Sequence, residues 1–130
     1  MATRTSISSG APYEPIFGYS RAVKVGDMVF VSGSTAIQSD GSVTGVGDAY
    51  AQAFAALRTI EKALQQAGAS LQHVVRTRMF ATNLDHTKAI GKAHAEFFRD
   101  IRPAATLVEI SRLVHPDMLI EIEADAIITE

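Results

Sequence analysis

Apolar and polar residues alternate in several short segments of the chain, as in β-strands with one buried face. Residues 21–25 alternate, Gly26 and Asp27 supply a turn, and residues 28–32 are rich in β-branched and aromatic side chains. This pattern predicts a β-hairpin. Further strands are predicted over residues 74–81, 106–110 and 119–128, the last of which alternates most clearly.

Two longer segments have apolar residues three or four positions apart, which predicts amphipathic helices. In the first, Asp48 is placed to cap the N-terminus and Gly68 to end the helix. The apolar stripe between them consists of Tyr50, Ala53, Phe54, Leu57, Ile60 and Leu64. In the second, Asp85 is the predicted cap, and the buried side is predicted to hold Ile90, Ala93, His94 and Phe97.

The remaining segments lack periodicity, and we expect residues 1–12 to form an irregular N-terminal arm and residues 39–47 a loop. The elements therefore follow the order ββαβαββ within one domain over residues 1–130. This order is typical of an α+β fold with two helices on one face of a mixed sheet.

The final strand predicts that the second face of the sheet is charged. Because side chains alternate, Glu121, Glu123 and Asp125 share the face opposite to that of the apolar residues. By the same parity Arg76 and Arg78 lie together, and Glu109 is expected to join them. Two interpretations remain open: a solvated or subunit-interface ion network, or a face on which one carboxylate lines a ligand cleft.

Composition excludes several classes of function. The chain of 130 residues has no cysteine, so it forms neither a disulfide nor a thiolate metal site. Its net charge of −2 is unlike the basic excess of nucleic-acid-binding proteins, so nucleic acid is not an expected partner. There is no secretory signal and no apolar run long enough to cross a membrane, which favours a cytoplasmic protein without a membrane partner.

No motif in the chain identifies chemistry by itself. The four histidines are widely spaced, so no metal site is expected. Ser32 and Ser34 flank Gly33 without the surroundings of a nucleophile elbow, and the glycines before Asp48 do not have the spacing of a phosphate-binding loop, so no cofactor is expected. On the apolar side of a helix, His94 is more typical of a satisfied core or interface histidine than of a catalyst.

Two long runs resemble the Rid family, also called the YjgF or L-PSP family. The first covers residues 18–33, from Gly18-Tyr19-Ser20-Arg21 to Val31-Ser32-Gly33, and the second covers residues 102–110 and 120–124. The resemblance extends from about residue 13 to residue 128. It implies a chorismate-mutase-like fold and a homotrimer whose sheets form a central barrel, with a small-molecule cleft at each subunit interface.

The resemblance also implies site residues, and here the chain departs from the branch similar to RidA. That branch hydrolyses enamines and imines such as 2-aminoacrylate, and it binds the substrate carboxylate through an arginine. Alanine occupies this position here, at Ala105, and Leu107 and Gly91 replace a family cysteine and asparagine. The expected site retains Glu121 as the catalytic carboxylate, which positions or activates water. The binding residues carried over are Tyr19, Gly33 and Thr106; we add His94 and Ala105 itself as candidates.

Three functions remain. The first is a Rid-type hydrolase or deaminase whose substrate lacks a carboxylate, or whose carboxylate is bound by another residue. Glu121 and Tyr19 favour it, and little action on 2-aminoacrylate is expected. The second is a regulatory or ligand-binding protein without turnover, favoured by Ala105. The third is an endoribonuclease, opposed by the acidic balance of charge. We also expect Glu121 and Glu123 to raise each other's pKa unless Arg76 or Arg78 compensates.

Overall fold

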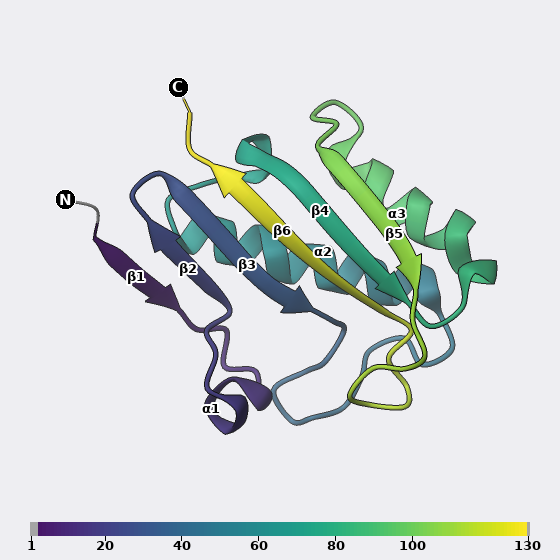
Figure 1. Cartoon of the computed structure of the whole chain (residues 1–130). Coiled ribbons are helices and arrows are strands. Elements are labelled where there is room, and N and C mark those ends of the chain that lie inside the picture. Colours follow the sequence, from purple (N-terminus) through teal and green to yellow (C-terminus); the bar gives the residue numbers. More distant parts are fainter. Residues whose placement is uncertain (1–2, 130) are drawn as a thin grey trace.

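Six β-strands pair in one mixed sheet in the order β1-β2-β3-β6-β4-β5 (Figure 1). The computed structural model describes residues 3–129. Neighbouring strands are antiparallel except β4 and β5, which are parallel. The strands are β1 (Arg4–Ile7), β2 (Ala22–Val25), β3 (Met28–Ser34), β4 (Val74–Ala81), β5 (Ala104–Glu109) and β6 (Ile120–Ile127).

The two long helices α2 (Ala49–Gln66) and α3 (Thr87–Phe98) lie against the same face of this sheet (Figure 1). The Asp48 side chain accepts a hydrogen bond of 3.0 Å from the amide of Ala51 and so caps α2 as predicted. Gly68, with φ of +80°, follows the end of the helix in the left-handed conformation that glycine adopts most easily. Shorter helical segments are α1 (Tyr13–Phe17), η1 (Leu71–His73) and η2 (Leu84–His86).

The core lies between the sheet and the two long helices. Every second residue of β6 from Ile120 to Ala126 is buried in it, and Leu57, Ile60 and Leu64 of α2 are fully buried. The predicted α+β class, with two helices on one face of a mixed sheet, is confirmed. The order ββαβαββ is correct for β2 to β6, and the segment β1-α1 precedes it.

The N-terminal arm and one helix cap depart from the prediction. Residues 4–7 are not irregular, because β1 pairs with β2 from Arg4↔Val25 to Ile7↔Ala22. Only Ile7 of this edge strand is buried, so its sequence carries almost no alternation. The cap is also different: Asn83 accepts a hydrogen bond from the amide of Asp85 and caps η2, and α3 begins after that turn. Residues 1–2 of the predicted arm lie outside the described residues.

The second face of the sheet carries the predicted charges in part. Arg78 donates hydrogen bonds to Glu123 at 3.1 Å and Asp125 at 3.3 Å. The prediction for Glu109 is wrong, because this residue pairs in register with buried Ala81 and accepts a bond from the amide of Leu84. It therefore lies on the helix side of the sheet.

Helices α2 and α3 leave this charged face open, and exposed apolar side chains lie beside its ion cluster. Register places Met28 and Phe30 of β3 opposite Ile127 and Asp125 of β6. Met28, Phe30 and Ile127 are each about two-fifths exposed in the single chain. No helix within residues 3–129 is long and apolar enough to cross a membrane.

Candidate functional site

A carboxylate of β6 packs directly on the backbone of β3. The pairing of the two strands is irregular between Val31 and Ser34, and Gly33 lies within this irregularity. An ideal Cβ on Gly33 would lie 2.1 Å from Oε2 of Glu121, closer than any real contact. Gly33 is not among the residues with positive φ. Glycine is therefore required here for space, and its absent side chain is what lets the Glu121 carboxylate reach this position.

The guanidinium of Arg21 fixes the same stretch of β3 from the other side. Arg21 is 3% exposed, and its Nη1 donates to the carbonyl oxygen of Gly33 at 2.7 Å and to Oγ of Ser34 at 3.1 Å. Its Nη2 donates to the hydroxyl of Tyr19 at 3.2 Å. Because the oxygen of Tyr19 accepts this bond, its own proton remains able to donate to a ligand.

A buried glutamate ties this arginine to α1. The carboxylate of Glu14 lies 3.6 Å from Nε of Arg21 and accepts hydrogen bonds from Ser9 and from the amide of Ala11. Burial raises the pKa of Glu14, but hydrogen bonds from Ser9 and Ser8 and the charge of Arg21 outweigh it and hold the pKa below its usual value. Glu14 is therefore charged at neutral pH, and its ion pair with Arg21 holds α1 against the arginine.

Arg21, Tyr19 and Gly33 border a cavity of about 390 Å³ that Glu121 also lines. Tyr13 and Phe17 of α1, whose rings stack at 5.3 Å, form part of its wall, and Tyr19 forms another. The cavity thus combines an aromatic wall, a tyrosine hydroxyl and a carboxylate. A volume of this size suits a small organic molecule.

Three influences set the pKa of Glu121. Burial raises the pKa of this carboxyl above its ordinary value, the charge of Arg21 opposes the rise, and the charge of Glu123 adds to it. The direction agrees with the prediction for Glu121, but burial is a larger cause than the neighbouring carboxylate. The compensating arginine is Arg21, whereas the sequence suggested Arg76 or Arg78.

The site residues expected from the sequence fall into two groups within one chain. Tyr19, Gly33 and Glu121 line the cavity. Ala105 and Thr106 lie on β5, which forms one edge of the sheet and does not contribute to that cavity. Their side chains point to opposite faces, because Ala105 pairs in register with buried Thr77, and Thr106 pairs with Arg78.

His94 also lies apart from the cavity, on α3. Its Nε2 is 2.9 Å from Oγ1 of the fully buried Thr77, and its ring contacts that of Phe98 at 4.7 Å. Burial lowers the pKa of the imidazole, which favours the neutral ring. This geometry supplies a partner for a buried hydroxyl, as expected of a core histidine.

Arg21 and Glu14 are the residues of this site that sequence reasoning missed. Arg21 was visible only as part of the run from Gly18 to Val23, where nothing distinguishes it from an exposed arginine beside a strand. Glu14 belongs to a five-residue helix that has no periodic signal. Within residues 3–129, no group of three or more histidine, aspartate or glutamate side chains could hold a metal ion.

Comparison with known proteins identifies the family. Residues 9–128 match the family described as endoribonuclease L-PSP. The chain belongs to this family. Rv2704 of Mycobacterium tuberculosis, a member of the YjgF/YER057c/UK114 family, is 45% identical and superposes with a TM-score of 0.89, covering 97% of this chain and all of its own.

Two further relatives support the same assignment. The YjgF protein of E. coli is 30% identical with a TM-score of 0.83, covering 95% of this chain and 98% of its own. The 3-aminoacrylate deaminase RutC of Acinetobacter baylyi is 38% identical over 92% of this chain and 94% of its own length. The resemblance to the Rid, YjgF or L-PSP family and the fold that it implies are therefore confirmed.

Proposed function

We propose that the protein is a hydrolytic deaminase of small enamines or imines, with Glu121 as the group that moves protons. The observation that carries this proposal is the Glu121 carboxylate itself. It is partly buried on Gly33, it faces a cavity, and its pKa is raised. A carboxylate exchanges protons with water most efficiently when its pKa is shifted toward neutrality.

The reaction moves both protons of a water molecule to nitrogen. An enamine first tautomerises to the imine. Glu121 then takes one proton from water as the oxygen of that water bonds to the imine carbon, and passes the proton to the nitrogen, which gives a carbinolamine. The hydroxyl of the carbinolamine then gives its proton, again through Glu121, to the nitrogen as the C–N bond breaks. Ammonia leaves and a carbonyl remains, so imine and water become carbonyl compound and ammonia. The hydroxyl of Tyr19 is placed to donate a hydrogen bond to the bound molecule.

Arg21 has a separate part in this proposal. Its positive charge lowers the pKa of Glu121 against the effect of burial. The guanidinium therefore limits the rise of this pKa, and its bonds to Gly33 and Ser34 hold the backbone beside the carboxylate.

The relatives support this class of reaction, and Ala105 restricts its substrates. The chain is 38% identical to a 3-aminoacrylate deaminase. Ala105 offers no donor where the sequence resemblance implies an arginine that binds carboxylate. Loss of a hydrogen bond to a charged group costs about 1.5–3 kcal/mol. We therefore propose substrates without a carboxylate at that point, and little action on 2-aminoacrylate.

We further propose that the molecule is a homotrimer with clefts between subunits. Glu121 and Ala105 do not meet within one chain, and β5 is an open edge of the sheet. Within residues 3–129, no helix covers the charged face or the exposed apolar residues beside it. A neighbouring subunit on this face would cover the apolar residues and complete each cleft.

A ligand-binding protein without turnover is the second candidate, and Ala105 is the observation that favours it. Binding needs the cavity but not a residue that moves protons. The family name also includes endoribonuclease activity. The net charge of −2 gives no general attraction for a phosphate backbone.

Turnover should depend on Glu121. An amine oxidase acting on a short alkylamine supplies an imine without a carboxylate, and ammonia release is followed. The wild-type protein should accelerate release, and Glu121→Gln should lower the rate at least about a hundredfold, because its amide cannot exchange the proton. Glu61→Gln, the same change on α2 outside both the cavity and the charged face, is the control and should keep wild-type activity. Equal activity in Glu121→Gln and wild type would refute the role of Glu121.

Substrate choice should depend on residue 105. With 2-aminoacrylate generated by a dehydratase, the wild-type rate should remain close to the spontaneous rate. Ala105→Arg should raise it by about tenfold or more, since a guanidinium can bind the carboxylate. Ala105→Gln adds bulk without charge and should not. Rapid wild-type hydrolysis, or the same rate for Arg and Gln at this position, would contradict the assignment.

The oligomeric state can be measured by light scattering. We expect a mass three times that of the 13.9 kDa chain. Arg78→Glu should reduce the mass, because it places a third carboxylate beside Glu123 and Asp125 on the buried face. Arg58→Glu changes charge equally on exposed α2 and should leave the trimer intact. A stable wild-type monomer at micromolar concentration would exclude the trimer.

A further inference from the structure

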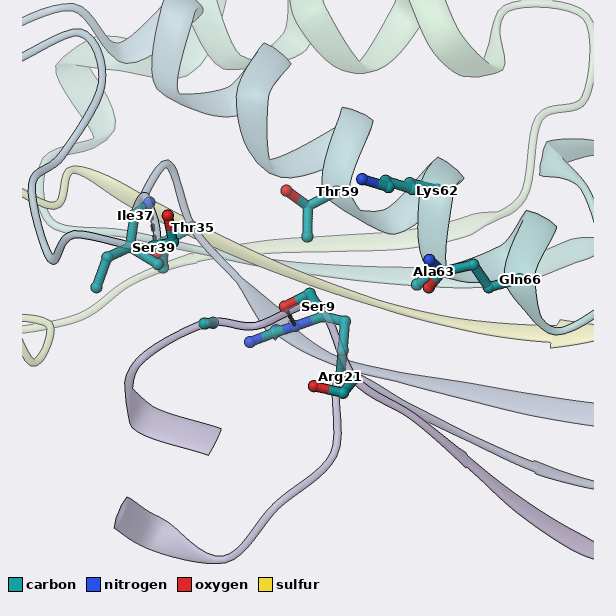
Figure 2. Close-up of a pocket in the computed structure, with 11 residues that line it drawn as sticks. Ser9, Arg21, Thr35, Ile37, Ser39, Thr59, Lys62, Ala63 and Gln66 are labelled. Carbon is teal, nitrogen blue, oxygen red and sulfur yellow. Dashed lines mark hydrogen bonds between the residues drawn. The ribbon is translucent and has the colours of Figure 1, made fainter. Parts of the chain in front are cut away.

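A second, smaller cavity lies between α2 and the segment that joins β1 to α1 (Figure 2). Its volume is about 180 Å³. Ser9 and Arg21 form one side, Thr59 and Lys62 of α2 form the other, and neither Glu121 nor Gly33 lines it. It is therefore a different cavity from the one that holds the proposed reaction, although it adjoins that cavity and Arg21, Thr35 and Ile37 border both.

One stripe of α2 supplies polar groups to this cavity. Thr59, Lys62 and Gln66 are separated by three and four positions, so they lie on the same side of the helix. Figure 2 shows their side chains along the cavity, with the small Ala63 between them. The apolar stripe of α2 packs on the sheet, and this polar stripe runs beside it.

The polar side chains of this stripe have no hydrogen-bonding partner among the described residues. Within residues 3–129, no hydrogen bond or ion pair joins the side chain of Thr59, Lys62 or Gln66 to another protein group. A hydroxyl, an ammonium and an amide are therefore available to a bound molecule. All three can donate a hydrogen bond.

The charges around the cavity select an anion. No aspartate or glutamate lines it, whereas Lys62 and Arg21 both do. The guanidinium of Arg21 already makes four hydrogen bonds within the protein. The charge of Arg21 is also paired with that of Glu14, so Lys62 is the group able to pair with an anion directly.

The size and the apolar wall narrow the class of anion. The volume is below the roughly 300–1,000 Å³ typical of sites for drug-sized ligands, so the occupant is small. Ala11, Ile37 and Ala63 form an apolar part of the wall. A carboxylate with a short aliphatic body matches both features, because its charged end can meet Lys62 while its carbon chain contacts these residues.

We propose that this cavity is a second binding site, specific for a small aliphatic monocarboxylate. Lys62 pairs with the carboxylate, and Thr59 and Gln66 donate hydrogen bonds to it. The site is independent of the reaction at Glu121, so it remains whether the protein turns over imines or only binds ligands.

Calorimetric titration with butyrate at low ionic strength tests this site. Butyrate should bind saturably to the wild-type protein, and Lys62→Gln should raise its Kd at least about tenfold. Thr59→Val keeps the shape of the side chain, removes the hydroxyl, and should raise the Kd severalfold. Lys88→Gln, at an exposed lysine of α3 outside the cavity, should bind as wild type does. The Lys62 side chain is exposed, so its replacement should not unfold the protein.

Three comparisons can overturn the proposal. Butyramide has the same shape without charge and should not compete; equal binding of the amide would refute an anion site. Tighter binding of inorganic phosphate than of butyrate would refute the carboxylate class. Glu121→Gln should bind butyrate like wild type, and loss of binding there, or unchanged binding in Lys62→Gln, would place the ligand outside this cavity.

Discussion

The buried guanidinium of Arg21 is the interaction on which the rest of the site depends. It joins the backbone of β3 at Gly33 to Tyr19 and, through Glu14, to α1. Removing one partner from a buried ion pair generally costs about 3–5 kcal/mol, because the remaining charge loses its compensation. Its position is therefore strongly determined, and the walls of both cavities are built around it.

The pKa of Glu121 is set mainly by its burial beside Gly33 and by the charge of Arg21, and less by the second carboxylate, Glu123. The absent side chain of Gly33 lets its carboxylate pack against β3, where burial raises its pKa and Arg21 limits the rise. The two effects oppose each other, and burial is the larger, so the pKa lies above its ordinary value. A solvent-exposed glutamate on the same strand would have neither influence and would stay ionised at neutral pH.

The sequence predicted those parts of the molecule that depend on regular periodicity. The stripe of α2 and the alternation of β6 follow directly from the spacing of their apolar residues, as does the face on which Glu121 lies. It could not predict β1, whose four residues bury only Ile7, or the burial of Arg21 and Glu14, which results from contacts between distant segments. Family resemblance identified Tyr19 and Gly33, but not that Ala105 lies apart from them within one chain.

The most direct test of this account is a carbon-13 NMR titration of the Glu121 carboxyl in the wild-type protein. The account predicts a pKa above the ordinary value of 4.5, because burial outweighs the charge of Arg21. Since the folded pKa is then higher than the unfolded one, the contribution of this group to stability is complete below about 4.5 and is lost as pH rises through the folded value. A measured pKa at or below 4.5 would contradict the central claim that the fold prepares Glu121 to exchange protons.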